Sequence, residues 1–399
     1  MAEAHWLTII GLGEDGPEGL SAASQKALGE AEVVMGSKRH LALVPDSGAE
    51  RVVWPVPFAD GLPLLDGLRG RQTVVLASGD PFWFGAGSIL ANRYEQGEWR
   101  SCPGVSVFSL AASRLGWALE KTSCLGCHAA PFSRLRPSLV PGQRALVTLR
   151  DGAAVADLAA YLAGIGFGGT RVVVLEGLGG PHERVSEASA ASYDIEGVRH
   201  PVCVGLEIAG DGSVLTSATG QSDEVFDTDG QITKRVIRAV TVSTLAPRRG
   251  EHLWDIGSGS GSIAIEWLMS HPSTTASAIE ARSDRAARIK KNAQTLGQDR
   301  LFIIEGFAPV MLDGLPSPQA VFVGGGLTSD LLDWLWTHLE TGTRIVANAV
   351  TLETSALLSE AQGRFGGSLI KIDLSEAAPL GKFRGWKAAY PVVQWSVTR

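Results

Sequence analysis

The stretch EHLWDIGSGSGSIAIEWLMS, residues 251–270, decides the fold of the second half of the chain. An apolar run ends at Asp255, glycines follow at alternate positions from Gly257 to Gly261, and a second apolar-rich run begins at position 262. A strand, a glycine turn and a helix in this order are typical of a doubly wound α/β fold, which binds ligands beyond the carboxyl ends of its strands. We therefore expect a ligand site at this turn.

The charges around the turn indicate the kind of ligand. A dinucleotide fingerprint needs a third glycine at position 262, where this chain has serine. Asp255 would repel a phosphate but suits an ammonium group. Glu280 ends the next predicted strand, where a carboxylate can accept hydrogen bonds from two ribose hydroxyls. The pair predicts a site for S-adenosylmethionine, with helix capping by Asp255 and a solvated strand end at Glu280 as the structural alternatives.

Strands and helices alternate through the rest of this half, and this alternation favours a mostly parallel sheet. Ser283 is a candidate N-cap and Gly297 a candidate stop for one of the helices. The last two segments, 369–376 and 388–398, are expected to pair as an antiparallel edge. The predicted helices are 233–245, 262–270, 283–297 and 329–340, and the predicted strands are 251–256, 274–281, 300–306, 320–326 and 344–350.

The first half repeats the α/β pattern without sharing a motif with the second. Strands are expected at 6–13, 32–37, 72–78, 144–151, 171–179 and 201–208, with helices after the strands 6–13 and 72–78 and over 105–119. Residues 209–231 are rich in Gly, Ser, Thr and Asp and carry few large apolar residues. The expected domains are 1–210, with lobes of about 1–115 and 116–210, a linker at 211–228, and 229–399.

Gly11, Gly13 and Gly16 have the GxGxxG spacing of a dinucleotide fold. Glu14 and Asp15 would place two negative charges beside a pyrophosphate, and the second predicted strand lacks a carboxylate for the ribose. We therefore interpret this loop as a tight turn that needs positive φ.

Composition narrows the class of protein further. Thirty-five Lys and Arg against 42 Asp and Glu give a net charge of −7, which argues against a broad nucleic-acid interface. No run approaches the roughly 18 apolar residues of a membrane span, and the start shows no export signal. We expect a cytoplasmic protein with four reduced cysteines. The motif CLGCH at 124–128 offers no second ligand pair, so neither a haem nor a metal is expected.

Several motifs carry a resemblance to known families. In the first half, GLGEDGPEGLS, GSKRHL, LASGDPFWFGAG and CPGVSVFSLAASRLGW resemble the tetrapyrrole methyltransferases. In the second half, ITKRVIRAVTVSTL, DIGSGSGSIAIEW, EGFAP, VFVGGG and ANAVTLET resemble the decarboxylating methyltransferases of the cobalamin pathway. In this order, the two halves resemble the precorrin-6Y C5,15-methyltransferases (decarboxylating).

This resemblance implies a fold and an activity. The fold is a two-lobed tetrapyrrole-methylase fold followed by a Rossmann-like, doubly wound methyltransferase fold with an antiparallel edge. The first half would methylate carbon 5 of a precorrin, and the second would methylate carbon 15 and decarboxylate the ring C acetate, giving precorrin-8X for cobalamin. Each half would bind one S-adenosylmethionine, and the partner is an anionic tetrapyrrole rather than a nucleic acid or a membrane. We also expect a homo-oligomer.

The resemblance also assigns site residues. No catalytic side chain is assigned, and none is required, because an electron-rich carbon of the macrocycle can attack the sulfonium methyl directly. Phe307 stands where the family commonly has an acidic residue, so either adenine packing or core packing is open for it. Substrate contacts are expected from His128 and from two basic clusters, Lys234 with Arg235 and Arg238, and Lys382 with Arg384, with solvated helix faces as the alternative. The cofactor positions are Gly79, Asp80, Pro81 and Ser106 in the first half, and Thr233, Asp255, Gly257, Ser258, Gly259, Ser260, Gly261, Glu280, Phe307 and Ala308 in the second.

Three other functions stay open at this point. The glycine turn alone does not separate a macrocycle methyltransferase from one that acts on RNA or protein. A tetrapyrrole carrier would use CLGCH as a haem handle and would show a Soret band. A nicotinamide oxidoreductase would bind a dinucleotide and not the sulfonium cofactor.

Overall fold

The central strands of three sheets are continuous apolar runs. This pattern is expected of strands whose two faces are both buried, because neither face needs polar residues. In this computed structural model, which describes residues 5–399, the chain divides into two compact units. One comprises the residues up to 130 together with 138–213, and the other comprises 131–137 with 214–399. The expected domain limits and the linker at 211–228 stay a prediction, although residues from Val214 onward cluster with the second unit.

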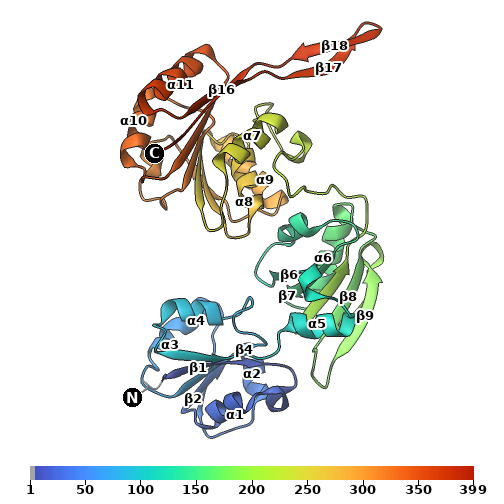
Figure 1. Ribbon diagram of the computed structural model, residues 1–399. Coiled ribbons are helices and arrows are strands. Elements are labelled where there is room, and N and C mark those ends of the chain that lie inside the picture. The colour runs from blue at the N-terminus through green and yellow to red at the C-terminus, as the bar shows by residue number, and fades with distance from the viewer. Residues whose placement is uncertain (1–4) are drawn as a thin grey trace. The chain divides into compact units, whose positions relative to one another are not determined.

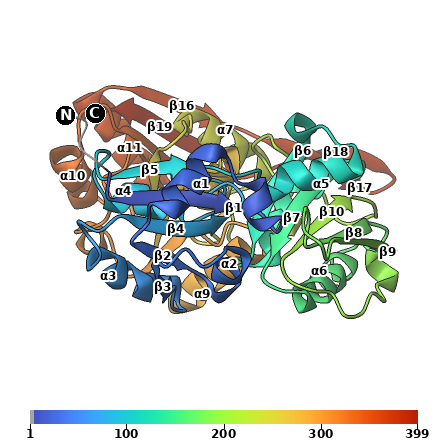
Figure 2. The same cartoon turned by 90° about the horizontal axis from the view of Figure 1, so that it is seen from below.

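The first lobe of the first unit is a parallel sheet of strand order β3-β2-β4-β1-β5, which can be followed in Figure 2. Strand β1, which pairs with β4 on one side and β5 on the other, is buried along its whole length. The elements are β1 (Leu7–Leu12), α1 (Ala22–Gly29), β2 (Val33–Gly36), α2 (Lys38–Leu43), β3 (Glu50–Val53), α3 (Gly61–Asp66), β4 (Thr73–Ser78), α4 (Gly87–Arg93) and β5 (Trp99–Cys102).

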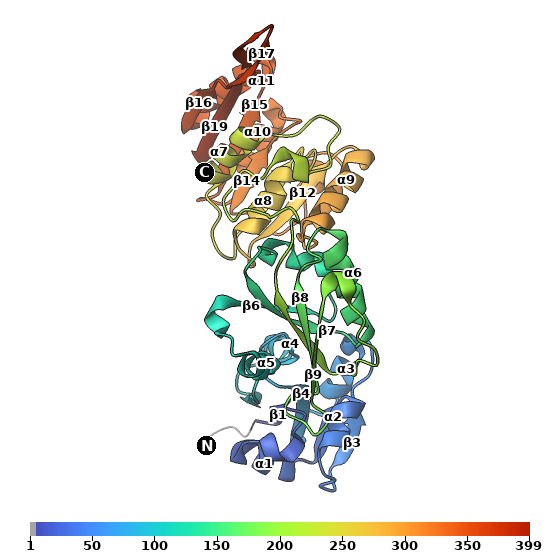
Figure 3. The same cartoon turned by 90° about the vertical axis from the view of Figure 1, so that its right-hand side faces the viewer.

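The second lobe is a mixed sheet of order β6-β7-β10-β8-β9, in which only β6 and β7 are parallel. Figure 3 shows α5 and α6 on opposite faces of this sheet. Phe108, Ala111 and Ala112 of α5 pack into its core, whereas the predicted lobe limit at residue 115 placed this helix in the first lobe. The elements are α5 (Val107–Leu115), β6 (Thr122–Cys127), β7 (Arg144–Leu149), α6 (Ala153–Gly164), β8 (Arg171–Glu176), β9 (Arg184–Ser189) and β10 (Val202–Glu207).

The second unit is a doubly wound sheet of order β13-β12-β11-β14-β15-β19-β16, parallel from β13 to β15. Strand β19 runs antiparallel to both of its neighbours, which confirms the predicted edge. The strands are β11 (His252–Ile256), β12 (Thr275–Glu280), β13 (Phe302–Glu305), β14 (Ala320–Val323), β15 (Arg344–Ala349), β16 (Ser368–Ile372) and β19 (Val392–Thr398).

Helices cover both faces of this sheet. Figure 1 shows α7, α8 and α9 on one face and α10 and α11 on the other, each with its own apolar core. Helix α9 begins at Ser283 with Arg282 as its N-cap, so the predicted cap at Ser283 is wrong by one residue, while Gly297 ends the helix with φ +72°. The helices are α7 (Arg235–Leu245), α8 (Ser262–Ser270), α9 (Ser283–Thr295), α10 (Ser329–His338) and α11 (Leu352–Phe365).

Two further strands, β17 (Ser375–Leu380) and β18 (Phe383–Ala388), form a hairpin that projects from the sheet of the second unit (Figure 1). Phe383 and Trp386 on this hairpin are 81 % and 79 % exposed. The sequence analysis did not predict it. Across residues 5–399, no helix has both the length and the hydropathy needed to cross a bilayer.

Candidate functional site

The glycine turn of the second unit joins β11 to α8 and carries a buried carboxylate. Asp255 is completely buried, and its Oδ2 accepts hydrogen bonds from the Ser258 hydroxyl at 2.7 Å and from the Ala264 amide at 3.1 Å. Its Oδ1 is buried without a hydrogen-bond partner. Burial raises the pKa of Asp255 to about 6, although both hydrogen bonds act in the opposite direction. A buried carboxylate oxygen of this kind is stabilised when a ligand donates a hydrogen bond to it or places a positive charge beside it.

Glu280 ties the neighbouring strand β12 to the same turn. Its Oε2 accepts a hydrogen bond from the Gly259 amide at 2.8 Å, and its Oε1 accepts one from the Arg282 amide at 3.1 Å. The negative charge of Glu280 contributes to the raised pKa of Asp255. Two carboxylates thus lie at the carboxyl ends of adjacent parallel strands, where they favour a ligand with positive charge and hydrogen-bond donors.

Glycine is required in this turn at the first position in particular. Gly257 has φ +66°, and a Cβ there would lie 2.5 Å from the carbonyl oxygen of Gly325, beyond the end of β14. Gly259 has φ +60° as well, but an added Cβ would meet no atom within 4 Å. The turn is therefore closely packed on one side and open on the other, an arrangement that fits a bound ligand.

Helix α9 fixes the far end of the turn through a residue that the sequence analysis missed. The Nδ2 of Asn292 donates to the carbonyl oxygens of Ser260 and Asp227, each at 2.9 Å, and its Oδ1 accepts from the Asp227 amide at 2.8 Å. A Cβ on Gly261 would lie 2.8 Å from the side chain of Ile289 on the same helix. Asn292 gave no signal in the sequence, since it is one polar residue in a polar helix.

Three predicted cofactor residues lie on loops around the turn. Phe307 follows β13 and is 73 % exposed, so the alternative of core packing is wrong for it. It lies at the same sheet edge as Glu280, because the amide of the preceding Gly306 donates to the Glu280 carbonyl oxygen at 2.9 Å. Ala308 packs against the core, and the half-buried Thr233 directly precedes the N-cap of α7.

The first unit contains a cavity of about 590 Å³ lined by both of its lobes. Gly79, Asp80, Ser106 and His128 line it, so four of the five residues predicted for this half are brought together. The fifth, Pro81, is buried outside the lining, and its carbonyl oxygen accepts from the Gly87 amide at 2.8 Å. The volume is in the range of sites for small organic ligands.

Three glycines meet closely beside this cavity, and one of them, Gly79, lines it. A Cβ on Gly11 would lie 1.9 Å from the carbonyl oxygen of Gly79 and 2.3 Å from the amide of Gly104, which itself donates to Gly79 at 3.0 Å. Gly16 has the expected positive φ, +60°. The GxGxxG spacing thus reflects a close backbone crossing at Gly11 and a left-handed turn residue at Gly16.

A polar cluster on the cavity wall was missed by the sequence analysis. Arg39 in the first turn of α2 is paired with Glu14, and its Nη2 donates to Ser78 Oγ at 2.8 Å and to His40 Nε2 at 2.9 Å. Burial, and next the charge of Arg39, lower the pKa of His40 to about 4, so this histidine is neutral at pH 7. The same two causes lower the pKa of His200. The available signal was the basic pair directly after the second strand, in GSKRHL.

Comparisons with known proteins cover both halves. Residues 6–194 match the family model of the tetrapyrrole (corrin/porphyrin) methylases, and residues 224–399 match that of the precorrin methyltransferase domain. A precorrin-6Y C(5,15)-methyltransferase [decarboxylating] of Sinorhizobium sp is 47 % identical over 99 % of this chain and 96 % of its own length. The chain belongs to the decarboxylating precorrin-6Y C5,15-methyltransferases. It is accordingly a methyltransferase that uses S-adenosylmethionine.

Two other comparisons cover less than half of the chain. A cobalt-precorrin-6B C(15)-methyltransferase (decarboxylating) of Salmonella typhimurium is 34 % identical over 40 % of this chain and 85 % of its own length. The crystal structure of the C-terminal domain of a Rhodobacter capsulatus precorrin-6Y C5,15-methyltransferase is 49 % identical, covering 46 % of this chain and all of that one, with a TM-score of 0.45.

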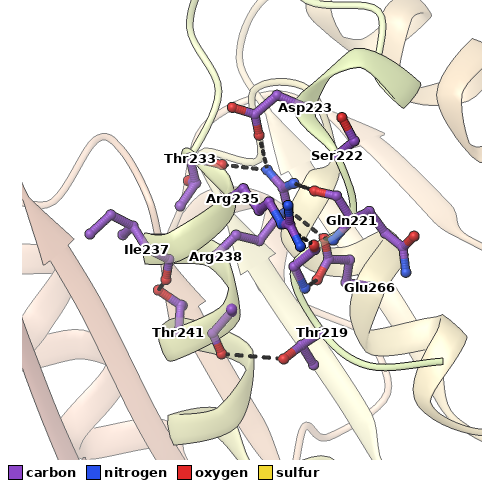
Figure 4. A network of polar contacts seen from close by, with 12 residues as sticks. Thr219, Gln221, Ser222, Asp223, Thr233, Arg235, Ile237, Arg238, Thr241 and Glu266 are labelled. Atoms are coloured by element: carbon purple, nitrogen blue, oxygen red, sulfur yellow. Dashed lines mark hydrogen bonds and ion pairs between the residues drawn. The ribbon is translucent and has the colours of Figure 1, made fainter. Parts of the chain in front are cut away.

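One substrate contact predicted for the precorrin site needs correction. Arg238 is completely buried, and Figure 4 shows its guanidinium surrounded by acceptors. It pairs with Glu266 at 2.5 Å and with Asp223 at 3.0 Å, and it donates to the carbonyl oxygens of Gln221 and Thr233 at 2.5 Å each. Arg238 is therefore a structural residue that cannot reach a substrate.

The other basic residues of the two predicted clusters are exposed. Lys234 Nζ lies 3.8 Å from Asp223, and Arg235 Nε donates to the Gly220 carbonyl oxygen at 2.9 Å. Lys382 and Arg384 lie on the hairpin β17–β18 rather than on a loop at the carboxyl ends of the parallel strands. A role for these four residues in precorrin binding stays a prediction.

The CLGCH motif occupies β6 and the residue after it. Cys127 is buried, and Cys124 is half-buried with its pKa raised by burial. Only His128 reaches the cavity, where the resemblance placed it. Within the described part of the chain, no three His, Cys, Asp or Glu side chains are grouped as metal ligands.

Proposed function

We propose that each unit binds its own S-adenosylmethionine: the first unit methylates carbon 5 of the precorrin, and the second methylates carbon 15 and decarboxylates the ring C acetate, giving precorrin-8X. The observation that carries the proposal is the unpartnered, buried Oδ1 of Asp255 beside the Glu280-bound turn. A cavity in the first unit supports a second, separate site. The catalytic limits would follow the expected domains, 1–210 and 229–399.

The residues of the second unit fit this cofactor. When bound, S-adenosylmethionine supplies a methyl group on a positively charged sulfur. Asp255 would attract its ammonium group, Glu280 would accept from its ribose hydroxyls, and the exposed ring of Phe307 would cover its adenine. Gly257, Ser258, Gly259, Ser260, Gly261, Thr233 and Ala308 would form the backbone surface around it.

In the first unit, the segment after β4 and the start of α5 would hold the cofactor. Asp80 Oδ1 accepts from the Phe82 amide at 2.9 Å, and Ser106 Oγ caps α5 through the Ser109 amide at 3.1 Å. Both side chains are thereby fixed while they line the cavity. Gly79 and Pro81 shape the turn, and His128 would face the substrate.

Neither unit needs a nucleophilic side chain in this proposal. The attacking atom is an electron-rich carbon of the substrate, so the protein aligns the reactants and excludes water. The electron pair that decarboxylation releases is taken up by the protonated imine system of the macrocycle.

Alanine variants of the full-length chain test the division of labour. With precorrin-6Y and the cofactor, Asp255→Ala and Glu280→Ala should give a product that has gained the carbon 5 methyl group and kept its acetate carboxyl, as measured by mass spectrometry. Asp80→Ala should give the converse. Asp284→Ala, which removes an exposed carboxylate of the second unit, is the control. Equal loss of both methylations in a folded variant would refute two separate sites.

The proposal includes a homo-oligomer formed through the hairpin β17–β18. A two-stranded hairpin is marginally stable alone, and this one exposes Leu380, Phe383 and Trp386 by 68 %, 81 % and 79 %. Large exposed apolar side chains on a projecting element are typical of interfaces. A second copy of the chain would cover them.

The proposal also covers partners and location. An anionic tetrapyrrole is the expected partner, and the net charge of −7 gives no support for a nucleic acid. The free thiols of Cys102, Cys124 and Cys203 fit the reducing conditions of the cytoplasm.

A further inference from the structure

The wall of the cavity in the first unit combines apolar side chains with one permanent cation. Val56, Trp83, Phe84 and Val105 line the cavity and are 95 %, 39 %, 52 % and 60 % exposed. Among its lining residues, all within the described chain, Arg39 is the single lysine or arginine. A ligand with several phosphates would need more cations than this, whereas a largely apolar ligand with a carboxylate at one place fits the wall.

Arg39 is held in place by its neighbours. Its guanidinium is paired with Glu14 and donates to Ser78 and His40, and Ser78 Oγ in turn lies 2.9 Å from His40 Nε2. His40 follows Arg39 in α2, and Ser37 caps that helix through the His40 amide at 3.2 Å. The guanidinium is therefore positioned before any ligand arrives, and 26 % of the Arg39 side chain remains exposed.

Arg39 lies next to the segment that is proposed to hold the cofactor in the first unit. Ser78, which accepts its hydrogen bond at 2.8 Å, immediately precedes Gly79 and Asp80. A carboxylate bound at Arg39 would thus lie beside the segment that holds the methyl donor. This contact fixes which edge of a flat ligand enters the cleft first.

We propose that Arg39 binds a peripheral carboxylate of the macrocycle in the carbon 5 site and that Glu14 occupies the guanidinium until that carboxylate replaces it, an inference that rests on the proposed function. The replacement exchanges one carboxylate for another on the guanidinium, so Arg39 has an anionic partner before and after the substrate enters. Arginine suits this role because its planar donors bind a carboxylate in a fixed orientation. Arg39 is thus a residue that sets substrate orientation, and it takes no part in bond making.

Steady-state kinetics of the full-length enzyme with precorrin-6Y and the cofactor test this role. Arg39→Gln should raise the KM for carbon 5 methylation by about tenfold to a hundredfold, the range of a charge-assisted hydrogen bond, and change kcat little. Arg39→Lys should recover only part of the loss. Carbon 15 methylation and cofactor binding by calorimetry should stay as in the wild type. Arg114→Ala, which removes an exposed arginine of the same unit paired with Glu183 outside the cavity lining, is the matched control.

Glu14→Gln separates substrate binding from a structural role. If Glu14 competes for the guanidinium, this variant should lower the KM, opposite to Arg39→Gln. If the ion pair only stabilises the unit, both variants should raise KM or lower stability alike, which would overturn the proposal. An unchanged KM in Arg39→Gln would overturn it as well while leaving the proposed function intact. A wild-type enzyme that methylates no tetrapyrrole would refute the proposed function itself, and the Arg39 assignment with it.

Discussion

The buried carboxylate of Asp255 lowers the stability of the second unit at neutral pH when no cofactor is bound. Its buried carboxyl has a pKa of about 6 against an ordinary value of 3.8, with burial as the main cause. Between pH 3.8 and about 6, the folded state keeps this carboxyl protonated while the unfolded state does not. The contribution of Asp255 to the free energy of unfolding is therefore fully present below pH 3.8 and is lost as the pH rises through about 6. Two pKa units correspond to about 3 kcal/mol.

Asp255→Asn should therefore stabilise the second unit at pH 7 in the absence of cofactor, by up to about 3 kcal/mol, and should flatten the dependence of its stability on pH between 4 and 7. The same variant should bind the cofactor more weakly in this unit. Thermal unfolding at several pH values and calorimetry with S-adenosylmethionine measure the two effects. A variant that is less stable at pH 7 would contradict the cause assigned to the pKa.

At the scale of single residues, sequence reasoning was strongest where position along a strand defines chemistry. Asp255 and Glu280 end adjacent strands, so their proximity follows from parallel pairing. Arg238 shows where this reasoning fails. In a run of basic residues, the sequence does not distinguish a buried arginine from an exposed one. Arg39 was missed for a related reason: its value depends on the cavity that the second lobe completes.

At the scale of elements, burial decided which strands were predicted. Strands β1, β8 and β11 are buried almost throughout and were recognised from their apolar runs. Strands β3, β5 and β9 were missed, and all three lie at sheet edges and contain no buried residue. Edge strands lack a continuous apolar signal because one side of each faces solvent.

A buried ion pair between Arg238 and Glu266 links α7 to α8. Arg238→Met should lower the free energy of unfolding of the second unit by about 3 to 5 kcal/mol, because Glu266 would keep its buried charge without a cationic partner. Adding Glu266→Gln should recover part of this loss, since it removes the unpaired buried charge and its one amide oxygen still accepts from the Gly220 or the Gln221 amide. Urea denaturation of both variants provides the measurement.

Arg282→Ala is the control for this prediction, because its ion pair with Asp284 is exposed and should contribute less than about 1 kcal/mol. A loss in Arg238→Met no larger than that of the control would show that the buried pair adds little.

At the scale of the whole molecule, the two-part organisation and both fold types followed from the motifs, whereas the hairpin β17–β18 did not. Its strands, SEAAPL and FRGWKA, contain no continuous apolar run and no buried residue, so nothing marked it as an ordered pair of strands.

Replacing Phe383 and Trp386 by serine should reduce the molar mass of the enzyme in solution, measured by light scattering after size-exclusion chromatography, if the hairpin joins copies of the chain. Phe302→Ser, which removes an exposed aromatic residue on β13, should leave the mass unchanged. A wild-type chain that is already monomeric would disprove the proposed interface.

The crossing of Gly11, Gly79 and Gly104 has a consequence for interpreting genomes. A Cβ on Gly11 or Gly104 would lie less than 3 Å from another backbone atom, and Gly79 has φ +54°, so we expect glycine at these points in relatives of this fold whatever they bind. A pattern search for nicotinamide enzymes will therefore keep selecting chains of this kind. The neighbouring acidic pair, Glu14 and Asp15, offers a simple filter for rejecting such false matches.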